Sequence, residues 1–319
     1  MHWAERERRR ALRLLNLFFP ILLALTGCNI DGELAECPYN VRLEYWYTSD
    51  GYDNLLPSYV YTLHEYLFDS EGILRERALR AVKSGIYTKM SLQPGDYTLV
   101  TWGNRDTVSL AAPLQIGKTK LSEIQLYTEK EGNTEPLYYS CHAFTVGKVG
   151  VTRERVDLLH CHLKLGVTVR WEATPPPNTG DFRMTLSGIC PAYLFTPEYT
   201  LNSLAGKVIN IPHRPQLPAY TTRQTESKMN ISREVEGTFY TYRLHNQDHP
   251  VFCLWSGNTA LMREIDLYRY FRTMQIDLDR NYRQEFNLLM VVDADGNVKV
   301  SSLLTGDWAE GGTIGTGDS

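Results

Sequence analysis

The sequence lacks the excess of positive charge on which nucleic-acid-binding proteins depend. It has 33 Lys and Arg against 37 Asp and Glu in 319 residues, for a formal net charge of −4. The first 27 residues carry five Arg and two Glu, so the remaining chain has a net charge of −7. No basic stripe is left along which a phosphate backbone could lie. The charge therefore argues against nucleic acid as a partner.

Cysteine is also scarce, with six residues in the chain: Cys28, Cys37, Cys141, Cys161, Cys190 and Cys253. An exported chain can form disulfides, but these cysteines are too sparse to be its scaffold. If Cys28 is modified, five remain, and an odd number leaves at least one thiol unpaired within the chain. The spacing leaves open which of the five pair.

The sequence contains no pattern typical of a catalytic site. A serine nucleophile elbow, Gly-x-Ser-x-Gly, does not occur. The glycines after Gly311 do not lie between a strand and a helix, as a phosphate-binding loop requires. Carboxylates are plentiful, but their spacing does not single out a glycosidase pair. We therefore predict that the protein is not an enzyme and needs no cofactor.

A His-Cys-His pattern is the nearest approach to a zinc site. His160 and His162 would share one face of a strand, while Cys161 would point the opposite way. Zinc sites use three or four ligands in recognisable spacing. We therefore interpret the two histidines as polar residues on an outer face.

An acidic turn resembles the start of a calcium-binding loop. It reads Asp293-Ala294-Asp295-Gly296, but an EF-hand has Gly at position six and Glu at position twelve. This chain has Val298 and Leu304 at those positions. We predict a turn here, and no metal ion in the protein.

No apolar run is long enough to span a bilayer, which takes roughly 20 residues. The longest, residues 14–25, follows five Arg and is interrupted by Asn16 and Pro20. A basic segment, a short apolar core and small residues before a cleavage site are the parts of a secretory signal. Leu25-Thr26-Gly27-Cys28 resembles the bacterial lipobox, which implies cleavage before Cys28 and acylation of its thiol. The alternative is an ordinary signal peptide with a cysteine near its cleavage site.

Residues 28–40 read as an acidic tether. Asp31, Glu33 and Glu36 resemble the acidic export signals of Bacteroidetes surface lipoproteins, although a solvated linker would have the same composition.

The remaining sequence predicts β structure. Apolar residues alternate at Val41, Leu43, Tyr45 and Tyr47, which is the pattern of a half-buried strand. Similar runs occur at 59–68, 73–79, 86–92, 97–102, 137–146, 182–188, 207–211, 238–244, 251–255, 286–292 and 298–304. We expect a loop over 212–234, and strand or partial helix over 264–278.

Two turns connect pairs of these strands. Pro94 and Gly95 suit the central positions of a type II turn, because glycine tolerates positive φ. Asp295 and Gly296, between apolar runs, predict a hairpin turn.

The longest strand pattern covers residues 159–171, where it either bends at Gly166 or crosses between two domains. A chain of this length predicts two domains, which we place at 41–156 and 157–319. Residues 1–27 form the signal peptide.

Two segments resemble a known family. Leu-Phe-Asp-Ser-Glu-Gly-Ile-Leu (residues 67–74) and Leu-Gln-Pro-Gly-Asp-Tyr-Thr-Leu-Val-Thr-Trp-Gly-Asn (residues 92–104) are similar to the FimB/Mfa2 family of Bacteroidetes fimbrial anchor subunits. The resemblance implies two tandem transthyretin-like (Ig-like) β-sandwich domains and a lipoprotein in the outer membrane. It also implies a base subunit that attaches the fimbrial shaft and pairs with pilins by strand addition.

A surface module that binds glycan or host protein is the alternative function. In that case Trp102, Trp171, Trp255 and Trp308 are candidates for stacking on sugars.

The family resemblance also bears on how the subunit would join its pilus. In that family an arginine-directed protease trims the N-terminal strand of shaft pilins, whereas residues 28–41 here contain no Lys or Arg. We therefore expect the N-terminus to be kept and the C-terminal region to contact the shaft, unless the last strand stays permanently docked. The candidate contact residues are Val298, Val300, Leu303, Leu304 and Trp308.

Overall fold

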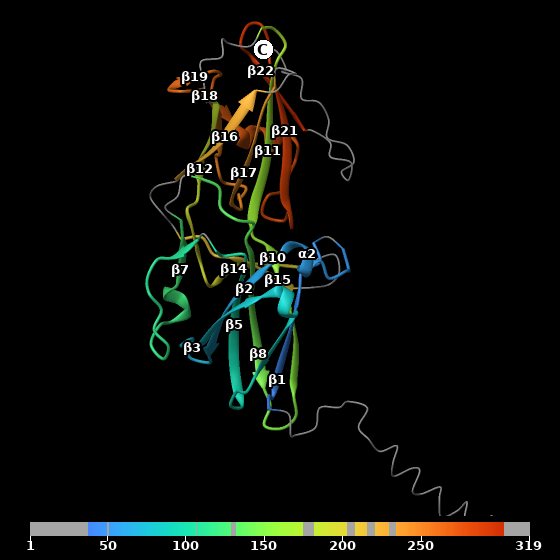
Figure 1. Ribbon diagram of the computed structural model, residues 1–319, viewed down its shortest axis with the longest axis vertical. Coiled ribbons are helices and arrows are strands. Elements are labelled where there is room, and N and C mark those ends of the chain that lie inside the picture. The colour runs from blue at the N-terminus through green and yellow to red at the C-terminus, as the bar shows by residue number, and fades with distance from the viewer. Residues whose placement is uncertain are drawn as a thin grey trace, which may run out of the picture.

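The computed structural model describes residues 38–302, except 50, 107, 129–131, 175–181, 203–207, 216–220 and 230–233. Strands dominate this part of the chain, so the all-β class is confirmed. Its helices are α2 (Leu56–Tyr59), α3 (Leu267–Thr273) and the 3-10 turns η1 (Val82–Ser84) and η2 (Leu121–Glu123). The first and second halves of the chain lie at opposite ends of an elongated molecule (Figure 1).

The first half forms a sandwich of two sheets, with strand orders β4-β1-β9 and β10-β8-β5-β2-β3. Val41, Leu43 and Tyr45 alternate along β1 and are fully buried, as their spacing predicts. They pack against residues of the larger sheet, among them Leu63 and Leu99. The strands are β1 (Val41–Trp46), β2 (Thr62–Asp69), β3 (Leu74–Ala81), β4 (Tyr87–Met90), β5 (Gly95–Gly103), β8 (Tyr138–Val146), β9 (Thr152–Asp157) and β10 (Leu159–His160).

The larger sheet is covered on its second face as well. A small sheet of β6 (Ser109–Leu110), β7 (Gln125–Tyr127) and β13 (Ala192–Leu194) belongs to this layer. The rings of Tyr193 and Phe195 lie with their centroids 5.8 Å from that of Trp102. Beside them, the hairpin of β14 (Pro197–Asn202) and β15 (Val208–Pro212) contacts β8. A segment from the second half of the chain therefore completes the core of the first.

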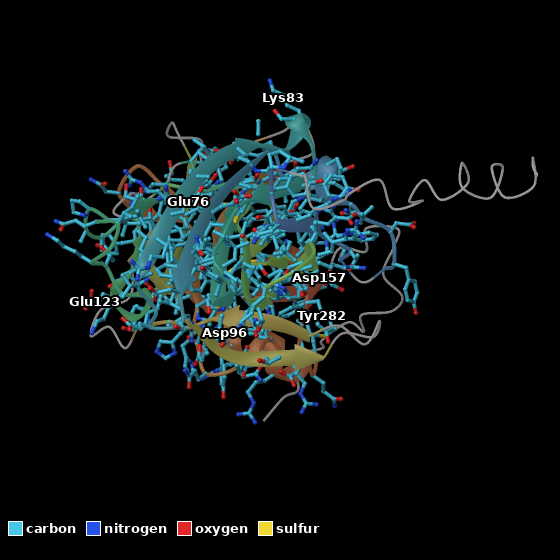
Figure 2. All side chains as sticks on the ribbon, turned by 90° about the horizontal axis from the view of Figure 1, so that it is seen from below. Glu76, Lys83, Asp96, Glu123, Asp157 and Tyr282 are labelled. Atoms are coloured by element: carbon cyan, nitrogen blue, oxygen red, sulfur yellow. The ribbon has the colours of Figure 1, made fainter. Side chains whose placement is uncertain are left out.

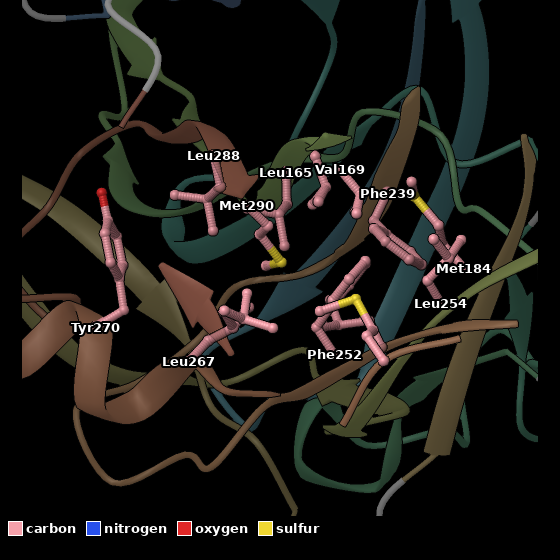
Figure 3. Packing of buried hydrophobic residues seen from close by; sticks show 14 of the residues in the cluster. Leu165, Val169, Met184, Phe239, Phe252, Leu254, Leu267, Tyr270, Leu288 and Met290 are labelled. Carbon is pink, nitrogen blue, oxygen red and sulfur yellow. The ribbon is translucent and has the colours of Figure 1, made fainter. Parts of the chain in front are cut away.

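The second half forms the second sandwich, which is one continuous sheet that folds over on itself. Its strand order is β19-β18-β12-β16-β17-β11-β21-β22. Its core joins Leu165 and Val169 of β11, Phe239 of β17, and Met184 and Leu254 of the facing strands (Figure 3). The strands are β11 (His162–Trp171), β12 (Phe182–Ile189), β16 (Thr221–Met229), β17 (Glu234–Tyr242), β18 (Val251–Ser256), β19 (Thr259–Ala260), β20 (Ile265–Asp266), β21 (Gln284–Val292) and β22 (Val298–Ser302).

Residues 264–278, expected as strand or partial helix, contain the short strand β20 and helix α3, which packs on this core. Asp266 begins the helix, because its carboxylate accepts a hydrogen bond of 3.0 Å from the Tyr268 amide. Leu267, Tyr270 and Phe271 are the buried residues of the helix.

The expected loop over 212–234 is wrong, because it contains β16. This strand pairs with β12 along most of its length and with β17 at Lys228 and Met229. Its polar sequence gives no hydrophobic alternation, but it lies between two strands whose backbone groups need partners. Pairing with both neighbours, and not local pattern, makes it a strand.

The pattern over 159–171 does cross from one sandwich to the other. β10 pairs with β8 of the first sandwich, whereas β11 pairs with β17 and β21 of the second. The two strands are separated by Cys161, whose amide donates to the Leu137 carbonyl. β11 continues without a break through Gly166.

The type II turn at Pro94 and Gly95 is corrected. Gly95 has φ of 154° and begins β5, whereas the second central position of that turn needs φ of about +80°. At the other predicted turn, Gly296 has φ of 79°, and residues 293–297 connect β21 to β22. There the Asp293 carboxylate accepts from the amides of Asp295 and Asn297 at 2.9 and 2.8 Å.

Candidate functional site

The two ends of the described chain lie far apart. β1 enters the first sandwich at the lower end of the molecule, whereas β22 belongs to the upper sandwich (Figure 1). Cys28 lies outside the described residues, so its acylation stays a prediction. Within the described part of the chain, no helix is long and apolar enough to cross a membrane.

β22 carries those candidate pilin contacts that the structure describes. Val298 is buried and Val300 packs against the same core, while Leu303, Leu304 and Trp308 lie outside the described residues. β22 pairs with β21 on one side, and no described strand pairs with its other side. An edge strand presents free backbone donors and acceptors, which are a template for another strand.

The Trp-Gly-Asn segment at the end of β5 has a structural role. Trp102 is fully buried, and a Cβ at Gly103 would lie 2.9 Å from Cγ1 of Val60. Asn104 is fully buried at φ of 57°, where its side-chain oxygen accepts from the Tyr61 amide and its nitrogen donates to the Tyr59 carbonyl, both at 2.8 Å. The segment therefore fixes the entry of the chain into β2.

Of the tryptophans proposed for sugar stacking, the three that the structure describes do not form an exposed platform. Trp102 and Trp171 are buried. Trp255 is half-buried, and its indole nitrogen donates to the Thr185 hydroxyl at 2.9 Å. Trp308 lies outside the described residues.

The cysteines of the described chain, Cys141, Cys161, Cys190 and Cys253, are free thiols. Burial raises the pKa of the Cys161 thiol to about 12, which keeps it protonated and unreactive at neutral pH.

The interpretation of His160 and His162 as outer-face residues is wrong. They do share a face, and their ring centroids are 3.6 Å apart, but their exposed fractions are only 1% and 2%. Tyr138 of β8 packs edge-on against both rings, and Glu285 of β21 lies beside them. The strand crosses between two sandwiches here, so the face that a single sandwich would expose is covered by both.

Arg243 is a further buried residue of this junction, and the sequence did not identify it. Its exposed fraction is 1%, and its guanidinium donates to the carbonyls of His160 at 3.0 Å and of Leu278 at 3.3 Å. It also donates to the carbonyls of Asn281 and Tyr282. One side chain thus joins the crossing strand to the loop before β21. Its position just after a strand gave no signal of this role.

The fold is shared with several solved structures. The fimbrial anchor protein Mfa2 from Porphyromonas gingivalis has 18% identity and a TM-score of 0.61, over 84% of this chain and 97% of that one. A candidate adhesin from Bacteroides ovatus has 16% identity and a TM-score of 0.62, over 84% and 94%. A candidate polysaccharide-binding protein from Bacteroides thetaiotaomicron has 13% identity and a TM-score of 0.58, over 82% and 95%.

Among curated proteins, none matches this chain. The profile of one family, the fimbrillin-A associated anchor proteins Mfa1 and Mfa2, matches residues 34–310. This range includes both sandwiches and residues 34–40 of the acidic segment before β1, and it agrees with the resemblance of residues 67–74 and 92–104. The chain therefore belongs to the Mfa2 family of fimbrillin-A associated anchor proteins.

Proposed function

We propose that this protein is a lipid-anchored base subunit that attaches a fimbrial shaft to the outer membrane. The observation that carries the proposal is the family match over residues 34–310. The arrangement of the molecule supports it, because the chain enters at one end of the long axis and β22 lies in the sandwich at the other (Figure 1). A tether at the first end and a contact at the second would let the body bridge membrane and shaft.

Acylation of Cys28 supplies the membrane attachment in this proposal. Each buried CH₂ group contributes about 0.8 kcal/mol, and stable anchoring takes more than one chain. A lipoprotein cysteine with several acyl chains meets that requirement. Cys28→Ala should release the protein from the membrane fraction or leave it unprocessed, whereas Cys141→Ala, which changes a thiol inside the fold, should remain membrane-bound. A mature-length Cys28→Ala protein that still fractionates with membranes would contradict lipid anchoring.

The contact with the shaft is assigned to the free edge of β22 and the residues after it. A pilin strand would pair with this edge, so that backbone hydrogen bonds supply affinity and side-chain pockets supply specificity. Deleting residues 298–319 should abolish retention of shaft pilins. Deleting only residues 303–319 keeps β22, so a comparison of the two deletions separates the contribution of the strand from that of the tail.

The deletions are scored only where the truncated protein reaches the surface and gives the strand-rich circular dichroism of the wild type. Retention of shaft pilins by the 298–319 deletion would refute the C-terminal route. It would leave the anchor function standing, because lipid attachment is measured separately.

Glycan binding is the second candidate function. It is favoured by the similar fold of the candidate polysaccharide-binding protein and by the exposed rings of Tyr52 and Tyr61, which are 77% and 50% exposed. Binding of surface glycans that is lost in a Tyr52→Ala, Tyr61→Ala double variant would support it. No binding on a glycan array would exclude it.

A further inference from the structure

Three metal-ligating side chains converge where the chain crosses between the sandwiches. His160 ends β10, His162 begins β11, and Glu285 lies on β21, which runs parallel to β11. One potential ligand atom from each residue lies within 4.8 Å of those of the other two. The two histidines are almost completely buried, and Glu285 is partly buried.

The hydrogen bonds of His162 leave one ring nitrogen available. Its Nδ1 lies 3.0 Å from the Leu137 carbonyl oxygen, which can only accept, so Nδ1 carries the proton. The lone pair is then on Nε2. A histidine that donates one nitrogen to a backbone carbonyl and offers the other to an ion is the usual arrangement in metal sites.

His160 is buried without a hydrogen bond to either ring nitrogen. Its Nε2 lies 3.4 Å from Glu285 Oε1, a contact that lacks hydrogen-bond geometry. Buried polar groups are normally satisfied, so an unsatisfied imidazole calls for an explanation.

Two arginines lie close to the cluster. Arg283 donates to Glu285 Oε2 at 2.8 Å, which orients the carboxylate and leaves Oε1 facing His160. Arg243 directs its guanidinium at backbone carbonyls, among them that of His160. Two neutral imidazoles and one carboxylate give the ligand set a charge of −1.

We propose that His160, His162 and Glu285 form a binding site for a divalent transition metal ion of the zinc class. Zinc holds nitrogen and carboxylate ligands at about 2.0–2.2 Å in a tetrahedron, which places ligand atoms about 3.3 Å apart. The His160–Glu285 contact of 3.4 Å meets that separation. The other two pairs of ligand atoms lie within 4.8 Å and would close by up to about 1.5 Å when the ion binds. Two imidazoles and one carboxylate are a ligand set that zinc uses, whereas calcium and magnesium prefer oxygen alone.

A small cleft lies beside His160. It is lined by residues of the first half of the chain, among them Tyr47, Ser49 and Asp157, and by Tyr282 of the loop before β21; Asp157 and Tyr282 are labelled in Figure 2. The cleft has room for about one water molecule, which would supply the fourth ligand. The ion would join the crossing strand to β21 next to β8, and so fix the two sandwiches relative to one another.

The test uses the whole chain with a non-histidine affinity tag, stripped with a chelator and titrated with zinc chloride. One zinc ion per chain should bind by calorimetry and raise the melting temperature by several degrees, and the chelator should reverse the rise. Cobalt(II) in place of zinc should give the visible absorption of a four-coordinate site. Three variants are compared with the wild type: His162→Gln, the nearly isosteric Glu285→Gln, and His249→Gln as an exposed histidine elsewhere.

His162→Gln and Glu285→Gln should each weaken zinc binding at least tenfold and abolish the melting shift, while His249→Gln behaves as wild type. Glu285→Gln is the decisive variant, because it preserves volume and its folding can be confirmed by circular dichroism. Absence of one-to-one binding at ten micromolar free zinc would overturn the proposal. Equal binding by a folded Glu285→Gln variant would overturn it as well.

Discussion

Replacing Asn104 tests whether the Trp-Gly-Asn segment holds the first sandwich together. Asn104 is fully buried and has φ of 57°, a conformation that asparagine tolerates better than other non-glycine residues. Its side chain bonds the Tyr61 amide and the Tyr59 carbonyl, both at 2.8 Å. These contacts connect the end of β5 to the residues that lead into β2.

The cost of the change follows from two separable effects. Asn104→Ala removes two hydrogen bonds of 2.8 Å, each contributing about 1 kcal/mol, and a longer, weaker one of 3.4 Å from the Thr62 amide. It also places alanine in a left-handed conformation, which costs about 1 kcal/mol more. Asn104→Gly removes the same hydrogen bonds without the conformational strain. We therefore expect losses of about 3 kcal/mol for alanine and about 2 kcal/mol for glycine.

Urea unfolding followed by tryptophan fluorescence measures both variants, and the buried Trp102 nearby reports on this sandwich. Asn104→Asp is a third comparison, because it keeps an acceptor for Tyr61 but places an oxygen against the Tyr59 carbonyl. It should be at least as destabilising as Asn104→Gly. If all three variants unfold at the wild-type midpoint, the reasoning about this segment is refuted.

Three further changes have outcomes that the structure specifies. Gly188→Ala should lose at least about 2 kcal/mol of unfolding free energy in thermal melts, because φ is 77° and the new Cβ would clash with the His249 carbonyl oxygen. Gly257→Ala is the control: its φ is 57° but no atom lies near the new Cβ, so it should lose only about 1 kcal/mol. Arg243→Leu should cost about 3–5 kcal/mol by the same assay, since four carbonyls lose a buried charged donor; an unchanged melt would contradict this. Burial, with nearby positive charge, lowers the pKa of His245 to about 3. Below about pH 6.5 the unfolded chain therefore takes up a proton on this imidazole that the folded chain does not, and the free energy of unfolding should fall by roughly 3 kcal/mol between neutral pH and pH 4. The pH profile of His245→Gln should be flatter, and an identical profile would exclude His245 as the cause.

The sequence predicted the parts of the fold that depend on local pattern. β1 alternates apolar and polar side chains and lies in the sandwich with the expected residues buried. Asp295-Gly296 lies in the turn between β21 and β22. In both places the information lies within a few residues, so a single sequence suffices.

Long-range contacts decided what the sequence did not predict. β16 is a strand because β12 and β17 pair with it, although its own residues are polar. His160 and His162 have the spacing of an exposed face, yet both sandwiches cover them. Glu285 completes their cluster from a distant strand, and spacing along the chain could not associate it with them.

The most direct test of the anchor function compares cells that carry the wild-type protein with cells that carry Cys28→Ala. Shaft pilin is quantified in washed cells and in the culture medium, with equal total pilin as the control. We expect pilin to shift from the cells to the medium in Cys28→Ala, together with the released anchor protein. Fimbriae that stay on the cells while the Cys28→Ala protein is shed would contradict it.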